Sequence, residues 1–164
     1  MKKYIYIIAS FTLLVCSCKP ELKGELGEST DKVAAMNGNW EVSAFMQRDE
    51  NNPIKEVRDL SEFYIVDGQT PTQLTFNSSD RSYIVVPGPG KNYFGEGGTW
   101  RFDDDFAPSE IVLETATDTF SLAMGTMPRD FDPTLSFELP RFCTDALGNR
   151  TPTVTYIINI SRVN

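Results

Sequence analysis

From Asn39 to the end of the chain, apolar and polar side chains alternate with a period of two residues, the pattern of half-buried β-strands. The first segment places Trp40, Val42, Ala44 and Met46 on one face. Seven further segments repeat the pattern, with the apolar residues Leu74 and Phe76; Tyr83 and Val85; Trp100 and Phe102; Ile111 and Leu113; Phe120, Leu122 and Met124; Leu135, Phe137 and Leu139; and Val154, Tyr156, Ile158 and Ile160. Eight short strands, each with one apolar face, predict an antiparallel barrel or sandwich.

Transmembrane barrels also alternate, but their strands need about 9–11 residues and aromatic girdles at both ends. Most segments here are shorter, and the connections between them are rich in turn-forming Gly, Pro, Asn, Asp and Ser. The pattern therefore predicts an all-β domain: a small, eight-stranded, antiparallel up-and-down barrel that is soluble.

Two short helices are expected beside the strands. The segment from Ser29 to Met36 predicts a helix capped by Ser29, Thr30 or Asp31 and stopped by Gly38. The second begins at Asp59-Leu60-Ser61-Glu62, which fits a capping box, and runs over residues 59–66. Its apolar face, which would cover an open end of the sheet, consists of Leu60, Phe63 and Tyr64.

Three stretches resemble a known family. Asn37-Gly38-Asn39-Trp40 resembles the Gly-x-Trp opening of lipocalins, and LTFNSSDRSYIV (residues 74–85) and GGTWRF (residues 97–102) are similar to lipocalin-like domains in lipoproteins of the Bacteroidetes. This resemblance implies an eight-stranded barrel that Trp40 plugs at one end beside Gly38, with Arg162 packed over the Trp. It also implies a binding module for a small apolar or amphipathic ligand.

The chain begins with a segment typical of a secretory signal. Lys2 and Lys3 precede an apolar run over residues 4–15, which is too short to span a bilayer as a helix. Val15-Cys16-Ser17-Cys18 resembles the lipobox of bacterial lipoproteins. We expect a signal peptide over residues 1–17, a lipid on Cys18, a flexible tether over residues 18–30 and a barrel domain over residues 31–164. This arrangement predicts anchoring to the cell envelope at the outer membrane, with periplasmic and surface-facing orientations both open.

The remaining cysteine, Cys143, has no partner for a disulfide once Cys16 is removed and Cys18 is acylated. The chain contains no histidine that would activate it as a nucleophile. A structural thiol, at least partly buried, is expected there. Without a recognisable Ser, Cys or Lys nucleophile motif, the sequence favours a protein that is not an enzyme.

Charge limits the classes of partner. Without Lys2 and Lys3, 13 of the 15 basic residues remain against 23 acidic ones, a formal charge of −10. Nucleic acids require an excess of cations, so they are not expected as partners. An anionic ligand is disfavoured for the same reason unless Lys91 or Arg101 is aimed inward.

The loop PGPGKNYFGEGG, residues 87–98, is the longest glycine-rich connection. It lacks the Ser or Thr and the following helix of a phosphate-binding loop, and so predicts a long hairpin loop. Tyr93 and Phe94, with Lys91, are candidate ligand contacts at the barrel mouth opposite Trp40; the alternative is that the two aromatic rings fold onto the core.

Two acidic groups, residues 103–105 and Asp130 with Asp132, do not match a calcium loop, so no metal and no cofactor are expected. Two functions remain. The protein binds a small apolar or amphipathic ligand, or it docks to another component of the cell envelope through its loops or outer surface. The aromatic residues expected inside the barrel leave little room, and a packed interior would favour docking.

Overall fold

The structure is a computed structural model that describes residues 30–129 and 132–163. The predictions on residues 1–17, Cys18 and Asp130 lie outside these residues. Within these described residues, one helix, nine strands and one 3-10 turn follow each other: α2 (Lys32–Met36), β1 (Gly38–Asp49), β2 (Val57–Asp59), η1 (Ser61–Phe63), β3 (Gln73–Phe76), β4 (Ser82–Val86), β5 (Gly97–Phe102), β6 (Glu110–Glu114), β7 (Thr119–Met124), β8 (Thr134–Thr144) and β9 (Arg150–Val163).

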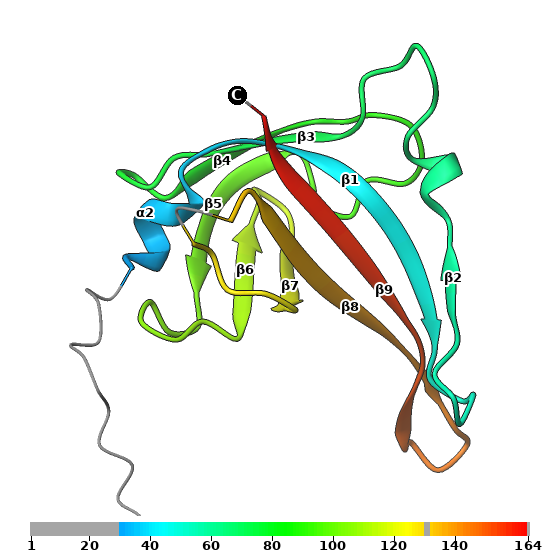
Figure 1. Ribbon diagram of the computed structural model, residues 1–164. Coiled ribbons are helices and arrows are strands. Elements are labelled where there is room, and N and C mark those ends of the chain that lie inside the picture. Colours follow the sequence, from blue (N-terminus) through cyan, green and yellow to red (C-terminus); the bar gives the residue numbers. More distant parts are fainter. Residues whose placement is uncertain (1–29, 130–131, 164) are drawn as a thin grey trace, which may run out of the picture.

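Eight of the strands close into an antiparallel barrel, as the alternation predicted (Figure 1). From β3 to β9 each strand pairs with the next one along the chain, β3 pairs with β1, and β1 pairs with β9 to complete the ring. Every segment predicted as a strand is a strand of this barrel. The prediction of a small up-and-down barrel with short helical elements is therefore confirmed.

Three strands are much longer than the others. β1, β8 and β9 contain 12, 11 and 14 residues, whereas β3 to β7 contain between 4 and 6. The long strands run past the short ones, and β2 pairs with β1 over residues 46–48 (Figure 1). We call this extension, made of β2 and the distal parts of β1, β8 and β9, the arm. Its strand β2 was not predicted, because Val57, Arg58 and Asp59 are all exposed and carry no alternation.

A β-bulge in β1 corrects the predicted inward face. Val42 pairs with Ile160 and Ala44 with Asn159, so Ser43 is an extra residue on β1. An extra residue shifts the alternation by one position. Phe45, which is 1% exposed, therefore points inward, and Ala44 and Met46 do not.

The barrel interior is filled by large apolar side chains. Trp100 makes edge contacts with Phe76 and Phe102, with ring centres 5.8 and 5.3 Å apart. The other buried core residues are Met36, Trp40, Val42, Phe45, Leu74, Tyr83, Val85, Phe94, Ile111, Leu113, Leu122, Leu135, Phe137, Ile158 and Ile160. Burial of this apolar surface is the main stabilising contribution to the fold.

Helix α2 has Asp31, one of the three predicted caps, as its N-cap residue. The Asp31 carboxylate accepts hydrogen bonds from the backbone N–H groups of Val33 and Ala34, at 2.9 and 3.0 Å. Ala35 and Met36 are buried against the barrel. Among the described residues, none of the helices has the length and apolar character needed to cross a membrane.

The second predicted helix, over residues 59–66, is instead the single 3-10 turn η1. Asp59 accepts a hydrogen bond from the N–H of Ser61 at 2.8 Å, two residues on, rather than capping an α-helix. Phe63 is 55% exposed, so the predicted apolar face is wrong at that position. Leu60 and Tyr64 do pack against the core. The Asp59 side chain therefore forms an Asx turn, and no α-helix follows the predicted capping box.

Cys143 is exposed, which corrects the expectation that it is partly buried. It lies on the part of β8 that belongs to the arm, beyond the barrel core. Its sulfur lies 4.0 Å from the hydroxyl of Thr153 on the neighbouring strand β9.

Candidate functional site

One end of the barrel is closed by Trp40 and Arg162, the predicted plug residues. Trp40 is fully buried, and its indole N–H donates a hydrogen bond to the carbonyl of Met36 at 2.9 Å. The guanidinium carbon of Arg162 lies 4.8 Å from the centre of the Trp40 ring, and its Nη2 donates to the carbonyl of Ala35 at 2.6 Å. Helix α2 is thus fixed over this end, which we call the closed end.

Gly38 makes the connection between α2 and the closed end possible. Its φ angle is 125°, a conformation that L side chains rarely adopt. The chain turns there from the helix into β1. The side chain of Asn37 secures the turn, because its Oδ1 accepts a hydrogen bond from the N–H of Ser78, in the β3–β4 connection, at 3.1 Å.

The other end of the barrel holds the loop over residues 87–96 and the turn η1. Ring centres of Phe45 and Tyr64 are 3.8 Å apart. The Tyr93 ring stacks on Phe45 and lies tilted against Tyr156, with ring centres 5.5 Å apart in both pairs. The loop also packs closely on Tyr64, because a Cβ at Gly90 would lie 2.6 Å from its Cδ1. The two segments predicted to border the mouth therefore meet each other across it.

Phe94 and Tyr93 have different environments. Phe94 is 3% exposed and makes an edge contact with Phe137, with ring centres 6.3 Å apart. Its backbone is fixed as well, since Tyr83 donates a hydrogen bond to its carbonyl at 2.9 Å and its N–H donates to Asn92 at 2.8 Å. Of the two predicted aromatic contacts, Phe94 belongs to the core, and Tyr93 remains at the rim.

Beside Tyr93, strands β7 and β8 separate. They pair only through Ala123 with Glu138 and Met124 with Phe137. Beyond these pairs the strands enclose a cavity of about 310 Å³, which we call the β7–β8 slot. It is lined by Lys91, Asn92, Tyr93, Thr119, Phe120, Ser121, Leu122, Leu139 and Arg141.

Pro140 explains why the strands separate at this point. The backbone carbonyl of Ser136 accepts a hydrogen bond from the N–H of Gly125, and the N–H of Ser136 donates to the Thr126 hydroxyl. Gly125 and Thr126 directly follow β7, so the backbone groups of Ser136 point toward that strand. Backbone groups alternate along a strand, so those of Glu138 and Pro140 face the same edge. Proline has no backbone N–H, so Pro140 cannot donate the next hydrogen bond to β7. The β7–β8 ladder therefore ends before this residue.

The slot carries two cations and no acidic side chain. Lys91 Nζ lies 5.3 Å and the Arg141 guanidinium carbon 5.7 Å from the centre of the Tyr93 ring. Within the described residues, neither cation forms an ion pair. Burial, together with the nearby Tyr64 hydroxyl, raises the pKa of Tyr93 above its ordinary value, so its phenol stays protonated at neutral pH.

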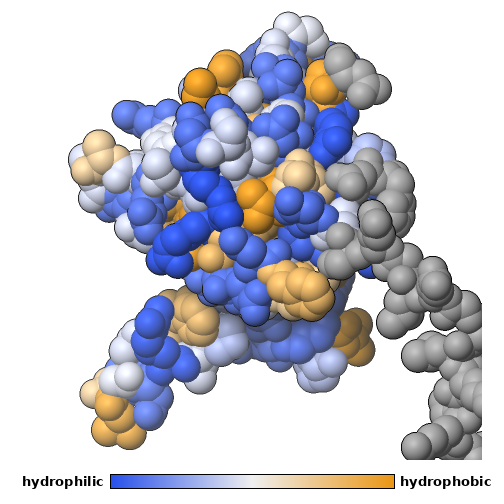
Figure 2. Space-filling view, turned by 90° about the vertical axis from the view of Figure 1, so that its left-hand side faces the viewer, coloured by the Kyte–Doolittle hydropathy of each residue, from blue (hydrophilic) through white to orange (hydrophobic). Residues whose placement is uncertain are grey.

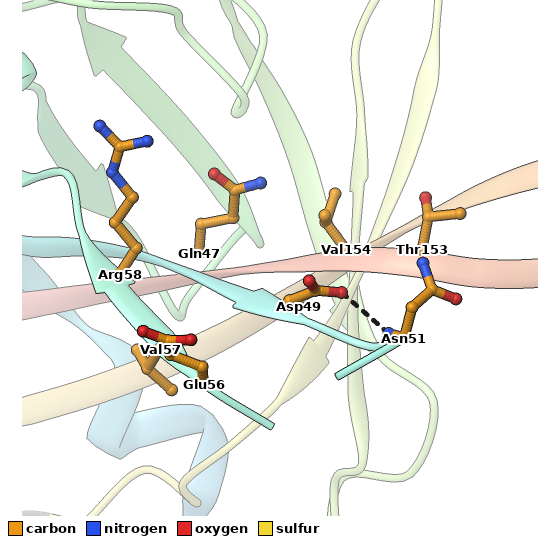
Figure 3. A pocket seen from close by; sticks show the side chains of 8 residues that line it. All are labelled: Gln47, Asp49, Asn51, Glu56, Val57, Arg58, Thr153 and Val154. Carbon is orange, nitrogen blue, oxygen red and sulfur yellow. Dashed lines mark hydrogen bonds between the residues drawn. The ribbon is translucent and has the colours of Figure 1, made fainter. Parts of the chain in front are cut away.

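A second cavity, of about 640 Å³, lies on the arm (Figure 3). Gln47 of β1 and Arg58 of β2 pair in register there, and Asp49 accepts a hydrogen bond from the N–H of Asn51 at 2.9 Å. The remaining lining residues are Glu56, Val57, Thr153 and Val154. Six of these eight residues are polar, they carry both signs of charge, and none of them is aromatic.

A network of ion pairs fastens the arm. Arg48 bonds Glu138 through both terminal nitrogens, at 3.1 and 2.9 Å, and Glu50 through Nε at 2.8 Å. Lys55 and the Thr155 hydroxyl also donate to Glu50, at 2.7 and 2.6 Å. These bonds, with that from Lys55 first, lower the pKa of Glu50 to about 2. The network joins β1, β8, β9 and the β1–β2 connection.

The acidic group at residues 103–105 is engaged within its loop. Asp103 accepts hydrogen bonds from Ser109, Asp104 accepts one from Phe106, and Asp105 pairs with Arg81 at 2.7 Å. Within residues 30–129 and 132–163, no cluster of His, Cys, Asp or Glu side chains has the arrangement of a metal site.

No protein-family model matches the chain, and a search of curated proteins finds no match either. The site is therefore interpreted from its own residues. Among them, Arg141 and Leu139 were not predicted. Pro140, a proline within a strand pattern, is the sequence signal that marks their position.

Proposed function

We propose that the protein binds a small amphipathic molecule in the β7–β8 slot, without catalysing its conversion. The observation that carries this proposal is the composition of the slot. Half-buried Phe120 and Leu139 supply an apolar wall, backed by the buried Leu122, and Lys91 and Arg141 line the same cavity. Ligand pockets typically measure about 300–1,000 Å³ and combine apolar walls with a few polar groups, which describes the slot.

The packing of the barrel supports the slot over the interior as the binding place. Trp100, Phe137 and Leu135 are all at most 2% exposed, and a ligand in the barrel centre would have to displace such side chains. The slot is bordered instead by Tyr93 and Phe120, which are only half-buried.

We also propose that the protein is a lipocalin-like lipoprotein of the cell envelope, anchored through Cys18. The lipobox-like sequence and the Gly38-Asn39-Trp40 motif support this. Helix α2, which lies at the closed end, is the first described element (Figure 1). A lipid on Cys18 would therefore tether the barrel by its closed end and leave the slot at the end away from that attachment.

A second candidate, docking to another envelope component, has support from the arm. Ile54 and Leu147, in the connections at its tip, are 80% and 87% exposed, and Phe142 nearby is 45% exposed. The face drawn in Figure 2 is otherwise largely polar, with its apolar side chains in small separate groups. Large contiguous apolar patches mark protein contacts, whereas single exposed apolar residues are ordinary, so these residues give docking less support than the slot gives ligand binding.

Two matched variants separate the candidates. Leu139→Glu places a charge in the slot, and Leu147→Glu places the same charge at the tip of the arm. The purified protein is screened by native mass spectrometry and by thermal shift against lipids and oligosaccharides. Binding in the slot predicts a ligand-induced rise in melting temperature that Leu139→Glu abolishes and Leu147→Glu retains, each measured against the variant's own baseline. If no compound binds and only Leu147→Glu changes the recovery of envelope proteins, docking is the function.

A further inference from the structure

We infer that the ligand of the β7–β8 slot is an amphiphile with an anionic head group, a carboxylate or a phosphate, held by Lys91 and Arg141. This inference rests on the proposed function, because it names the class of molecule that the slot binds. It follows from the pairing of charges, from the geometry around Tyr93 and from the order of side chains along β8.

The pairing of charges is uneven over the molecule. The chain has 23 acidic residues against 15 basic ones, and Arg48, Lys55, Arg81 and Arg101 each pair with a carboxylate. Other cations, such as Arg58 and Arg150, form no ion pair within the described residues, but Lys91 and Arg141 are the two that line the slot together. Lys91 and Arg141, which both line the slot, form no ion pair within the described residues, and no Asp or Glu lines the slot with them. A positive site on an acidic protein is electrostatically complementary to an anion.

Arg101 and Lys91 differ in where they point. Both side chains are exposed, but Arg101 bonds Glu114 on the barrel surface at 3.2 Å. Lys91 lines the slot beside Tyr93. Of the two cations that the sequence analysis considered for an anionic ligand, Lys91 therefore lies at the slot and Arg101 does not.

Tyr93 organises the two cations. Both lie over its ring, at 5.3 and 5.7 Å from the centre, which is within the range of a cation–π contact. Such a contact leaves the ammonium and guanidinium N–H donors available for an anion. Tyr93 is in turn held by stacking on Phe45 and by a tilted contact with Tyr156. The aromatic ring therefore presents two like charges at one place, where an anion would relieve their repulsion.

The order of side chains along β8 gives the ligand a direction. Leu139 and Arg141 are two residues apart and share the inward face, opposite Tyr156 and Val154 of β9. Two residues of a strand span about 7 Å. An apolar chain packed on Leu139 thus has its head group at Arg141, at the outer rim of the slot. This order matches an amphiphile that inserts tail first.

Isothermal titration with three ligands of equal chain length tests the inference: decanoate, decyl phosphate and decanol, each kept below its aggregation concentration. We expect both anions to bind at least tenfold more tightly than decanol, with a difference that shrinks as NaCl is raised from 0.05 to 0.5 M. Lys91→Gln and Arg141→Gln should each weaken anion binding by about fivefold or more and leave decanol binding unchanged. Arg101→Gln, which removes the same charge outside the slot, should leave all three affinities unchanged.

The outcomes separate the inference from the proposed function. If decanol binds as tightly as the anions, or if Arg101→Gln weakens anion binding as much as Arg141→Gln does, the anionic head group is wrong while amphiphile binding stands. If none of the three ligands binds, and the lipid and oligosaccharide screen also finds nothing, the proposed function itself fails. A preference for only one of the two anions identifies which head group the site takes.

Discussion

Arg162 and Trp40 occupy directly paired positions on β9 and β1, and the guanidinium carbon lies 4.8 Å from the centre of the indole ring. Each side chain also donates a hydrogen bond to a carbonyl of α2, Trp40 to Met36 and Arg162 to Ala35. The first strand, the last strand and the helix are thereby joined at one point. Trp40 and Arg162 are 122 residues apart in the sequence. This contact seals the closed end of the barrel.

Replacement of Trp40 by Ala should lower the free energy of unfolding by about 3–5 kcal/mol, because it removes a fully buried aromatic side chain. Urea unfolding followed by circular dichroism measures the change. Phe106→Ala, a replacement of an aromatic residue that is 75% exposed, serves as the control and should change stability by less than about 1 kcal/mol. An unchanged urea midpoint for Trp40→Ala would show that this residue does not plug the barrel.

Replacement of Arg162 by Met should lower stability by about 1–3 kcal/mol. Met keeps much of the apolar contact with Trp40 but leaves the Ala35 carbonyl without its donor. Arg101→Met removes an exposed cation and should stay within about 0.5 kcal/mol of the wild type. Equal unfolding free energies for the two variants would contradict a structural role for Arg162.

Replacement of Glu50 by Gln should lower stability at pH 7 and make it less dependent on pH in acid. The folded-state pKa of Glu50 is about 2, below the ordinary value of 4.5, so its ionised form stabilises the fold above about pH 4.5. That contribution is lost as the pH falls toward 2. The difference in melting temperature between wild type and Glu50→Gln should therefore be constant from pH 7 to 5 and shrink below pH 4.5. Asp67→Asn, which removes a carboxylate from an exposed loop position, is the matched control; a difference that grows in acid would refute the assignment.

Replacement of Pro140 by Thr should extend the β7–β8 ladder. Thr restores the missing N–H at the position opposite Ser121, given that Ala123 pairs with Glu138. We expect slower amide hydrogen exchange at Ser121 and at residue 140, and weaker binding of any ligand that uses the slot. Pro128→Thr, outside both strands, should change neither. Unaltered exchange and unaltered binding in Pro140→Thr would mean that the proline does not hold the slot open.

Replacement of Cys18 by Ser should release the protein from membranes into the soluble fraction, because several acyl chains, each worth about 0.8 kcal/mol per buried CH₂, would be lost. Fractionation after a high-salt wash measures this. Cys143→Ser, which removes the exposed thiol of the arm, should leave the distribution unchanged. Membrane association that survives Cys18→Ser would overturn the proposed lipid anchor.

The strands of the barrel could be predicted from the sequence because each buries one face, and a period of two follows directly from strand geometry. The bulge at Ser43 could not, because Ala44 and Met46 continue the apolar alternation that Phe45 in fact takes over. Only the pairing with β9 across the barrel decides which of the two alternations faces inward.

The site was predicted in part. The loop over residues 87–96 was placed at the end opposite Trp40, and Lys91 and Tyr93 do line a cavity there. Arg141 comes to the same cavity from 50 residues further along the chain, through the pairing of β8 with β9. The neighbouring Pro140 marks a break in the strand pattern, but it does not show which loop lies beside the break. The burial of Phe94, next to Tyr93, could not be predicted either, because a loop has no fixed period from which the direction of a side chain follows.

The central claim, that the β7–β8 slot is the binding place, is tested most directly by nuclear magnetic resonance. Decanoate is titrated into the ¹⁵N-labelled protein, and backbone amide shifts are followed. We predict that the largest shifts lie at Ser121, Leu122, Leu139 and Arg141, on the two strand edges that face each other across the slot. Largest shifts at Gln47, Arg58 and Thr153, on the cavity of the arm, would contradict the claim.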